Sequence, residues 1–178
     1  TLMNVSSIAA LAACLTAAPV LAELKPAKTP AGSTENTRTY VFKSTPQGDL
    51  KVHVYLPPGW TPAQKRPAII MLFGGGFTRG TPGQFTTKAQ YLASRGMVAL
   101  TPEYRLKTKH NITIDKCFED GKSAVRWVRM NAGELGVDPT RVVCSGGSAG
   151  GTLSVMAAMT SQFEPGGEDG SISSRPDA

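Results

Sequence analysis

An uninterrupted apolar run, Ala68 to Phe73, limits the fold of this chain more than any other feature of its sequence. A strand with one solvent-exposed face alternates apolar and polar residues, whereas a strand that is apolar throughout is buried on both faces. Strands of that kind lie in parallel sheets that helices cover on both sides. The run therefore predicts an α/β fold with a mostly parallel sheet.

The residues before and after this run divide into further elements. Thr39 to Thr45 and Leu50 to Leu56 are predicted strands, and the turn at 46–49 should join them in an antiparallel hairpin. Later residues predict two more strands, at 97–101 and 141–144, and three helices, at 86–94, 115–132 and 149–159. A hairpin followed by alternating strands and helices indicates an α/β fold with helices on both faces of the sheet.

The predicted helix at 115–132 has a marked amphipathic pattern. Its apolar residues recur at intervals of three and four, with Asp115 placed to cap it and Gly133 placed to end it. Its basic residues lie on other faces of the helix: Lys116, Lys122, Arg126 and Arg129. After this helix, Asp138-Pro139 predicts a turn that leads into the strand at 141–144.

The first 22 residues have the composition of a signal peptide. They carry no charged side chain, and Ile8 to Leu21 is an apolar, alanine-rich run that is too short to span a bilayer. Small residues precede Glu23 where a signal peptidase would cut, so residues 1–22 predict a secreted or periplasmic protein. Residues 11–14 also resemble a lipobox, which would instead attach a lipid to Cys14. Both interpretations stay open, and both imply export.

The rest of the chain divides into a flexible lead, 23–37, and one domain, 38–178. The net charge is +6, but Lys and Arg are scattered along the sequence, which weighs against nucleic acid binding. The apolar surroundings of Cys117 and Cys144 favour buried thiols over a disulfide. No metal-binding spacing is present, so the sequence predicts neither a metal nor a cofactor.

Residues 146–151, Gly-Gly-Ser-Ala-Gly-Gly, contain the pattern Gly-x-Ser-x-Gly between a predicted strand and a predicted helix. A sharp turn there exposes the serine hydroxyl and brings strand and helix so close that Gly146 and Gly150 must lack side chains. The carboxyl edge of a parallel sheet also suits an active site. The pattern predicts Ser148 as a nucleophile, and the alternative is a glycine-rich turn without chemistry.

Acyl transfer also needs backbone N–H groups that hold the oxyanion. Ala149, directly after the serine, would supply one of them. Gly74, Gly75 and Gly76 follow the buried strand and are candidates for the others, with Gly74 and Gly75 as the predicted pair. A phosphate-binding loop is the alternative, but these glycines fit neither common phosphate-loop spacing.

Three motifs occur in a fixed order: Phe73-Gly74-Gly75-Gly76-Phe77, then Pro102-Glu103-Tyr104-Arg105, then Gly146 to Gly151. Together they resemble the α/β-hydrolase fold in its hormone-sensitive-lipase-like esterase branch, over about Tyr40 to Met159. The resemblance implies a serine ester hydrolase that acts on small-molecule or carbohydrate esters without metal or cofactor. It also implies a structural role for Tyr104-Arg105, and Phe73 stands where the branch usually has His.

The resemblance implies an acid and a histidine after the serine. No histidine follows Ser148, and the later carboxylates lie in a tail rich in Gly, Ser and Pro. We therefore expect that the last strands of the fold are missing, that the strand exposes an edge at 142–144, and that the chain is an inactive fragment. His53, on the polar face of a strand, and His110, in a basic loop, are poor replacements for the base.

The leading hypothesis is an exported carboxylic ester hydrolase for short-chain acyl esters. A serine peptidase of the same fold is an alternative. A non-catalytic α/β-hydrolase-like protein that binds a ligand in the same cleft is another. The lack of a histidine after Ser148 favours the non-catalytic binding protein, and the intact serine turn favours an enzyme.

Overall fold

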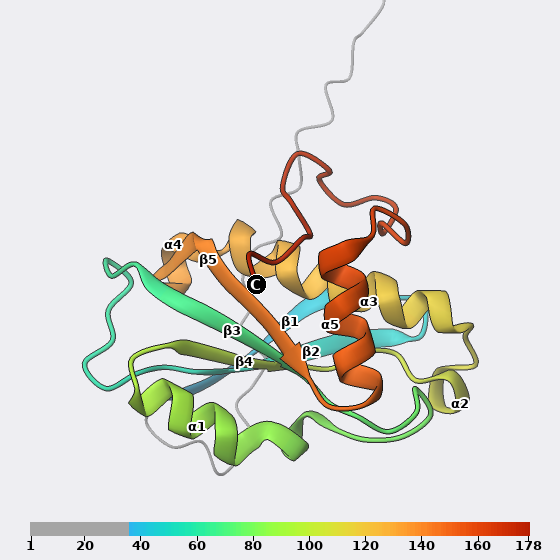
Figure 1. The fold of residues 1–178 in the computed structure, drawn as a ribbon, viewed down its shortest axis with the longest axis horizontal. Helices are drawn as coiled ribbons and strands as arrows, with labels where there is room; N and C mark the ends of the chain where they lie inside the picture. The colour runs from blue at the N-terminus through green and yellow to red at the C-terminus, as the bar shows by residue number, and fades with distance from the viewer. Residues whose placement is uncertain (1–35) are drawn as a thin grey trace, which may run out of the picture.

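The computed structural model describes residues 36–178. The predicted signal peptide, Cys14 and nearly all of the predicted lead lie outside these residues. Within the described part of the chain, no helix is both long and apolar enough to cross a membrane. Figure 1 shows a twisted sheet with helices packed on its two faces.

The sheet has five strands in the order β1-β2-β4-β3-β5. Their bounds are β1 (Thr37–Thr45), β2 (Gly48–Tyr55), β3 (Arg66–Leu72), β4 (Val98–Pro102) and β5 (Val137–Gly146). β1 pairs antiparallel with β2, and β2 pairs antiparallel with β4. β3 runs parallel to both of its neighbours, β4 and β5. The predicted hairpin is thus confirmed, and it forms the antiparallel edge of a mixed sheet whose other three strands are parallel.

The helices lie on opposite faces of the sheet, as β3 shows. Leu72 of β3 faces α3 (Ile114–Met130) and α5 (Ala149–Met159), where it lies close to Gly121. Its neighbour Met71 points to the other face, toward Leu92 of α1 (Thr86–Ser94). Three shorter pieces complete the set: η1 (Pro82–Phe85), α2 (Lys107–His110) and α4 (Ala132–Leu135). Helices on both faces agree with the predicted α/β fold.

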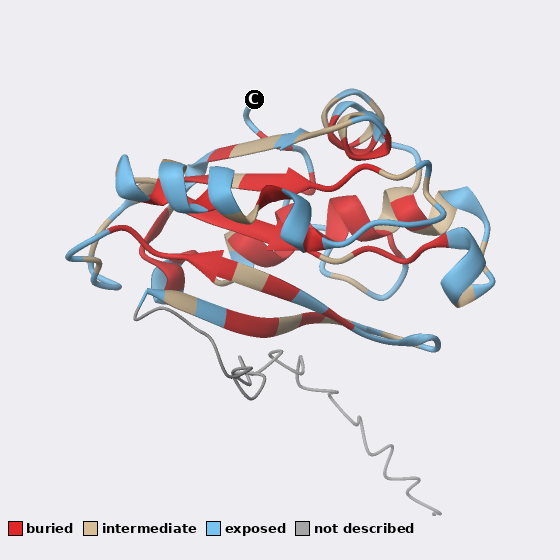
Figure 2. Cartoon of the chain, turned by 90° about the horizontal axis from the view of Figure 1, so that it is seen from below, coloured by how far each residue is buried: buried red, intermediate tan, exposed pale blue. Residues whose placement is uncertain are grey.

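The core lies between the sheet and its helices, where Figure 2 shows the buried residues. β4 is buried along its whole length, and β3 is buried at all positions of its apolar run except Ile69, which is partly buried. These two strands therefore supply much of the core. The fully buried apolar residues include Val54, Ala68, Ile70, Leu72, Val98, Ala99, Leu100, Val125 and Val142. The apolar run that predicted a doubly covered strand is therefore buried as expected.

Three local predictions about element ends are wrong. Thr113, with extended backbone, caps the start of α3 in place of Asp115, which lies in the first turn. The helix ends at Met130, with Asn131 as its C-cap, before it reaches Gly133. Asp138 lies inside β5 and not in a turn before it. Asp138 does accept hydrogen bonds from Thr140, as a turn residue would, but strand pairing with β3 already begins at Val137.

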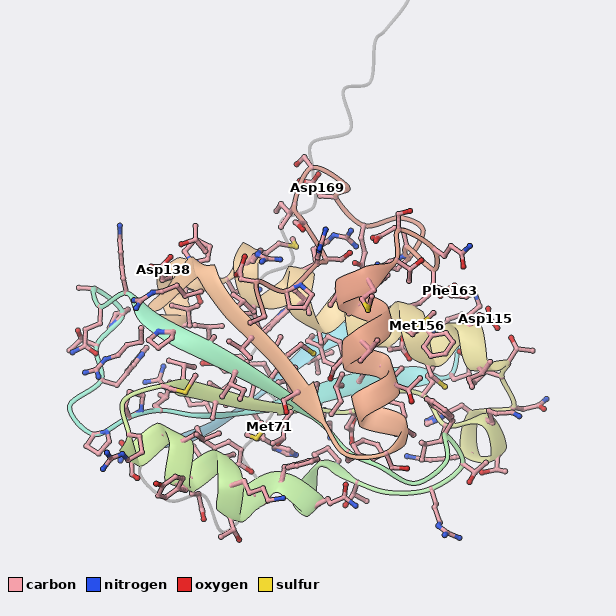
Figure 3. All side chains as sticks on the ribbon, viewed as in Figure 1. Met71, Asp115, Asp138, Met156, Phe163 and Asp169 are labelled. Carbon is pink, nitrogen blue, oxygen red and sulfur yellow. The ribbon has the colours of Figure 1, made fainter. Side chains whose placement is uncertain are left out.

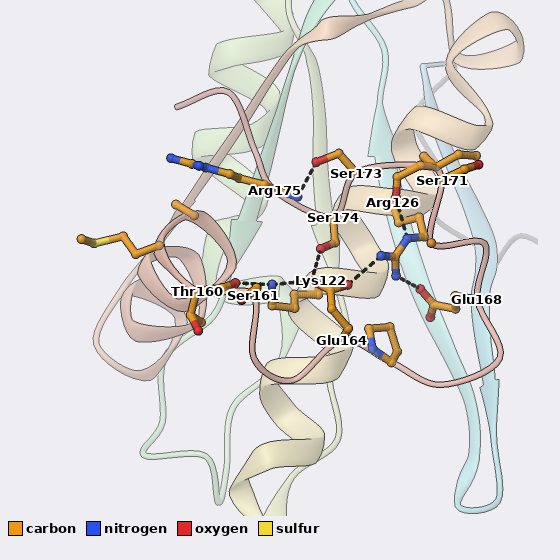
Figure 4. A pocket seen from close by; sticks show the side chains of 15 residues that line it. Lys122, Arg126, Thr160, Ser161, Glu164, Glu168, Ser171, Ser173, Ser174 and Arg175 are labelled. Carbon is orange, nitrogen blue, oxygen red and sulfur yellow. Dashed lines mark hydrogen bonds and ion pairs between the residues drawn. The ribbon is translucent and has the colours of Figure 1, made fainter.

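The C-terminal tail, residues 160–178, packs on the basic face of α3. Lys122 and Arg126 are only 1% and 4% exposed. Glu164 accepts hydrogen bonds from both, and Glu168 accepts one from Arg126 (Figure 4). The amphipathic pattern placed these cations on faces away from the apolar stripe, and the tail covers the two of them.

The tail also pairs with part of the β5 edge. Asp177 N–H donates to the Val142 carbonyl, and Cys144 N–H donates to the Ala178 carbonyl, both at 2.8 Å. The Asp177 carboxylate accepts a third hydrogen bond from the Val142 N–H. The prediction of an open edge at 142–144 is therefore wrong for these residues, because their backbone groups have partners.

Candidate active site

Ser148 lies on the sharp turn that joins β5 to α5, at the lower end of β5 in Figure 1. Its φ of +51° and ψ of −119° are unusual for a residue with a side chain. Ser148 is exposed, and its hydroxyl has no hydrogen-bond partner among residues 36–178. A strained backbone that presents a free hydroxyl at the carboxyl edge of a sheet is typical of a nucleophile turn.

The glycines on either side of Ser148 are required by close backbone contacts. A Cβ on Gly150 would collide with the Leu72 carbonyl oxygen of β3. A Cβ on Gly146 would lie 2.6 Å from that same oxygen and would collide with Gly150. No side chain fits at such distances, so only glycine lets α5 start this close to the sheet.

The glycine loop after β3 touches this turn. A Cβ on Gly74 would lie 2.7 Å from the Gly147 carbonyl oxygen and 3.3 Å from Ser148 Cβ. The structure thus brings together the two sequence motifs that predicted the site. Gly75 and Gly76 follow with φ of +138° and +62°, conformations that favour glycine.

The N–H groups of this loop differ in their partners. The Gly74 N–H already donates a 2.7 Å hydrogen bond to Gln84 Oε1. Within the described chain, neither the Gly75 N–H nor the Ala149 N–H has an acceptor. Gly74 therefore brings the loop against Ser148. Among the candidate donors, Gly75, Gly76 and Ala149 carry N–H groups without an acceptor in residues 36–178, and these remain free to bind a ligand oxygen.

Tyr104 and Arg105 connect the loop to the rest of the fold. The Tyr104 hydroxyl donates to the Phe73 carbonyl at 2.8 Å, and the two rings stack at 4.2 Å. Arg105 binds Asp120 of α3 through Nε and a terminal nitrogen, at 2.8 Å each. Both contacts are structural in character. Phe73, where the resembling branch has His, supports the loop by stacking.

Neither histidine makes a contact with Ser148. The ring of His53 lies 2.9 Å from Thr39 Oγ1 on the hairpin. Burial lowers the pKa of His53, against a smaller rise from Glu103. His110 Nδ1 accepts the Leu106 N–H at 2.7 Å. The sequence placed His110 in a loop, but this segment forms the short helix α2. Of the carboxylates after Ser148, Glu164, Glu168 and Asp177 bind basic residues of α3. Asp169 accepts hydrogen bonds from Ser171, so none of the four contacts a histidine at this site.

The two described cysteines are free thiols. Cys117 is buried, and its thiol donates to the Arg105 carbonyl at 3.1 Å, while Cys144 lies 3.5 Å from Ser154 Oγ. Burial raises the pKa of both thiols to about 11, which keeps them protonated at neutral pH. Residues 36–178 contain no group of His, Cys, Asp or Glu placed to hold a metal ion.

Residues 52–173 match the BD-FAE family. The chain belongs to this family. Its fold is that of the α/β-hydrolases in their hormone-sensitive-lipase-like branch, as the three motifs predicted. The matched range includes the glycine loop, the Tyr-Arg pair and the serine turn, so the whole described site lies within it.

The curated and solved proteins that this chain resembles include several esterases. Esterase 2 of Thermogutta terrifontis, in the structure phosphorylated by paraoxon, is 44% identical over 81% of this chain and 55% of its own, with a TM-score of 0.78. Carboxylesterase NlhH of Mycobacterium tuberculosis is 32% identical over 62% of this chain and 34% of its own length. Arylacetamide deacetylase of Bos taurus is 30% identical over 70% of this chain and 32% of its own. The chain thus spans about a third of these curated relatives and about half of the solved esterase.

Proposed function

We propose that this chain is the nucleophile-bearing part of an exported carboxylic ester hydrolase. The single observation that carries the proposal is the strained, exposed Ser148 held against the glycine loop. Ser148 Oγ would give its proton to the base and attack the acyl carbonyl, and the ester C–O bond would break so that the alcohol leaves, protonated by the base. Water would then hydrolyse the acyl-enzyme and release the acid. The N–H groups of Gly75 and Ala149 would hold the oxyanion, with Gly74 as the contact that brings them close.

The acid and base of the triad would come from residues beyond position 178. A serine hydroxyl without a base is a weak nucleophile at neutral pH, because it stays protonated. The 178-residue chain would then be an inactive fragment, although it carries the nucleophile and the oxyanion donors. Reading the gene past codon 178 tests this directly, since an in-frame Asp and His would complete the triad.

The acyl group would be short. Structures of the Thermogutta terrifontis esterase carry propionate or butyrate, and this chain shares 45% of its aligned residues with each. The same esterase is phosphorylated by paraoxon, as expected for an activated nucleophile. These observations support a small-molecule ester as substrate, and they favour an esterase over a peptidase.

Turnover of an acetyl ester tests the proposal. We expect the 178-residue chain to show no turnover above its Ser148→Ala variant. We expect the intact gene product to hydrolyse the ester and to lose this activity with Ser148→Ala. A peptide amide assayed in parallel separates an esterase from a peptidase. If the intact gene product hydrolyses neither the acetyl ester nor the peptide amide, although Ser148 is exposed on the same turn, the result would instead support a binding protein.

Export has its own test. Expression of the full precursor in a bacterial host and sequencing of the mature N-terminus should give a chain that begins at Glu23. A lipid-modified N-terminus at Cys14 would select the lipobox alternative. An unprocessed N-terminus would contradict both.

A further inference from the structure

The loop with the free N–H groups is fixed at one peptide unit, the one between Phe73 and Gly74. Its carbonyl oxygen accepts a 2.8 Å hydrogen bond from the Tyr104 hydroxyl. Its N–H donates a 2.7 Å hydrogen bond to Gln84 Oε1. Both sides of a single peptide plane are therefore held by side chains, one that follows β4 and one from η1.

Close packing by Tyr104 and Gly80 also restricts this part of the loop. The Phe73 ring stacks on Tyr104 with 18° between the planes. Gly80, where the loop returns, has a φ of +112°, and a Cβ there would collide with the Phe73 ring and with the Gly74 carbonyl oxygen, which belongs to the next peptide unit and shares its plane with the Gly75 N–H. The Phe73–Gly74 peptide plane cannot rotate without the loss of one or both hydrogen bonds. Its orientation is thus determined by these two side chains.

That orientation matters because it sets where the next N–H points. Gly74 lies against Gly147 and Ser148, and Gly75 carries the first N–H of the loop that has no acceptor in the described chain. An oxyanion donor stabilises a transition state only when it is aimed correctly before the reaction starts. The Gly75 N–H belongs to the next peptide plane, which joins the Phe73–Gly74 plane at the Gly74 Cα. A displacement of the clamped plane would therefore move the Gly75 N–H relative to the serine.

We propose that Gln84 and Tyr104 are positioning residues that clamp the Phe73–Gly74 peptide and thereby aim the Gly75 N–H at the oxyanion. This inference rests on the proposed function, since it needs Ser148 to be the nucleophile. It also assigns Gly74 a structural part, because its N–H is occupied by Gln84. Gln84 belongs to no recognisable sequence motif, so its role as a positioning residue follows from the geometry alone.

Two substitutions at Gln84 in the intact gene product separate the hydrogen bond from the side-chain volume. Gln84→Met keeps the length of the side chain and removes the acceptor. Gln84→Glu keeps an oxygen that accepts the Gly74 N–H. We expect Gln84→Met to lower kcat about tenfold with KM nearly unchanged, because the donor acts mainly in the transition state. Gln84→Glu should keep most of the wild-type kcat.

Tyr104→Phe tests the other side of the peptide plane, because it removes the hydroxyl and keeps the stacked ring. It should lower kcat in the same way as Gln84→Met. The double variant should lose less than the product of the two single losses, since both side chains act on one peptide unit. Gln90→Met, at an exposed position of α1, is the matched control and should leave kcat and KM unchanged.

The outcomes are distinguishable. If Ser148→Ala abolishes turnover while Gln84→Met and Tyr104→Phe keep the wild-type kcat, the clamp is wrong and the proposed function stands. If Gln84→Glu loses as much kcat as Gln84→Met, the acceptor is not what matters and the assignment is also wrong. If Ser148→Ala keeps full turnover, both the clamp and the proposed function are overturned.

Discussion

Ser148 shows at the scale of one residue how the fold holds an unfavourable conformation. Its φ of +51° and ψ of −119° would cost a residue with a side chain about 1–3 kcal/mol in isolation. The contacts between Gly150 and the Leu72 carbonyl leave the chain no room to relax. The strain is thus built into the junction of β5 and α5, where it presents the hydroxyl to solvent.

This strain predicts a stability difference between two inactive variants. Ser148→Gly relieves the strain, whereas Ser148→Ala retains it, so the glycine variant should be more stable by about 1 kcal/mol. Urea unfolding followed by circular dichroism measures the difference. An alanine variant as stable as the glycine variant would show that the turn is unstrained.

At the glycines of the turn we expect the opposite effect, because there an added side chain should lower the stability of the fold. Gly150→Ala places a methyl group against the Leu72 carbonyl oxygen, and we expect it to destabilise the fold by about 3 kcal/mol. Gly133→Ala is the control, because its Cβ would meet nothing within 4 Å in α4. That control should be neutral or slightly stabilising in the same urea titration. Equal stability of the two variants would contradict the close approach at Gly150.

Sequence reasoning found some of these residues and missed others for a physical reason. Ser148 and its glycines follow a fixed spacing, because the crossing of strand and helix imposes glycine at set positions. Gln84 follows no spacing, since its contact with Gly74 depends on how the loop folds back. No periodicity or motif marks a residue of that kind.

At the scale of elements, Asp120 joins three parts of the fold. Its carboxylate accepts hydrogen bonds from the Arg105 backbone and guanidinium and from Lys43 Nζ, and it is fully buried. It therefore links α3 to the segment after β4 and to β1. Lys43 and Arg105 share this one carboxylate, so a substitution of Asp120 would remove the ion pairs of both.

Asp120→Asn should destabilise the protein by about 3 kcal/mol or more, because it leaves the buried Arg105 with only a 3.5 Å contact to Glu119 as its counter-charge. Asp138→Asn is the control, since Asp138 pairs with an Arg141 side chain that is 54% exposed. That change should cost less than about 1 kcal/mol. Thermal unfolding of both variants at neutral pH measures the difference. A small effect at Asp120 would mean that water replaces it.

Element prediction succeeded where the pattern was local. α1 and α5 begin and end at the predicted residues, because their composition and flanking residues decide their length. The one-turn pieces η1, α2 and α4 were missed, since four residues are too few to show a helical period. Figure 3 shows Asp138 at the start of β5, far from the serine turn, where pairing with β3 extended the strand beyond its local signal.

At the scale of the whole molecule, the tail and α3 form one ionic network that no local pattern predicts. Lys122 donates to the Thr160 carbonyl and to Glu164, and Arg126 binds Glu164, Glu168 and the Ile172 carbonyl. Figure 4 shows these side chains converging beneath the tail. Buried cations without such partners would be costly, so the tail and the helix face depend on each other.

This network predicts how stability depends on acid. Burial raises the pKa of Glu164, but hydrogen bonds from Lys122, Arg126 and Ser174 outweigh it and lower the pKa from 4.5 to about 2. Because the pKa in the folded state lies below that of the unfolded chain, the contribution of Glu164 is complete above about pH 4.5. It is lost as the pH falls toward 2.

Glu164→Gln should remove this dependence. Urea midpoints of the wild-type chain should fall between about pH 4.5 and pH 2 more steeply than those of the variant, and the two should converge at the acid end. Glu134→Gln, at an exposed position of α4, changes the same charge outside the network and should run parallel to the wild type. If the Glu164→Gln curve also runs parallel to the wild type, the tail does not hold its ionic contacts with α3 in solution.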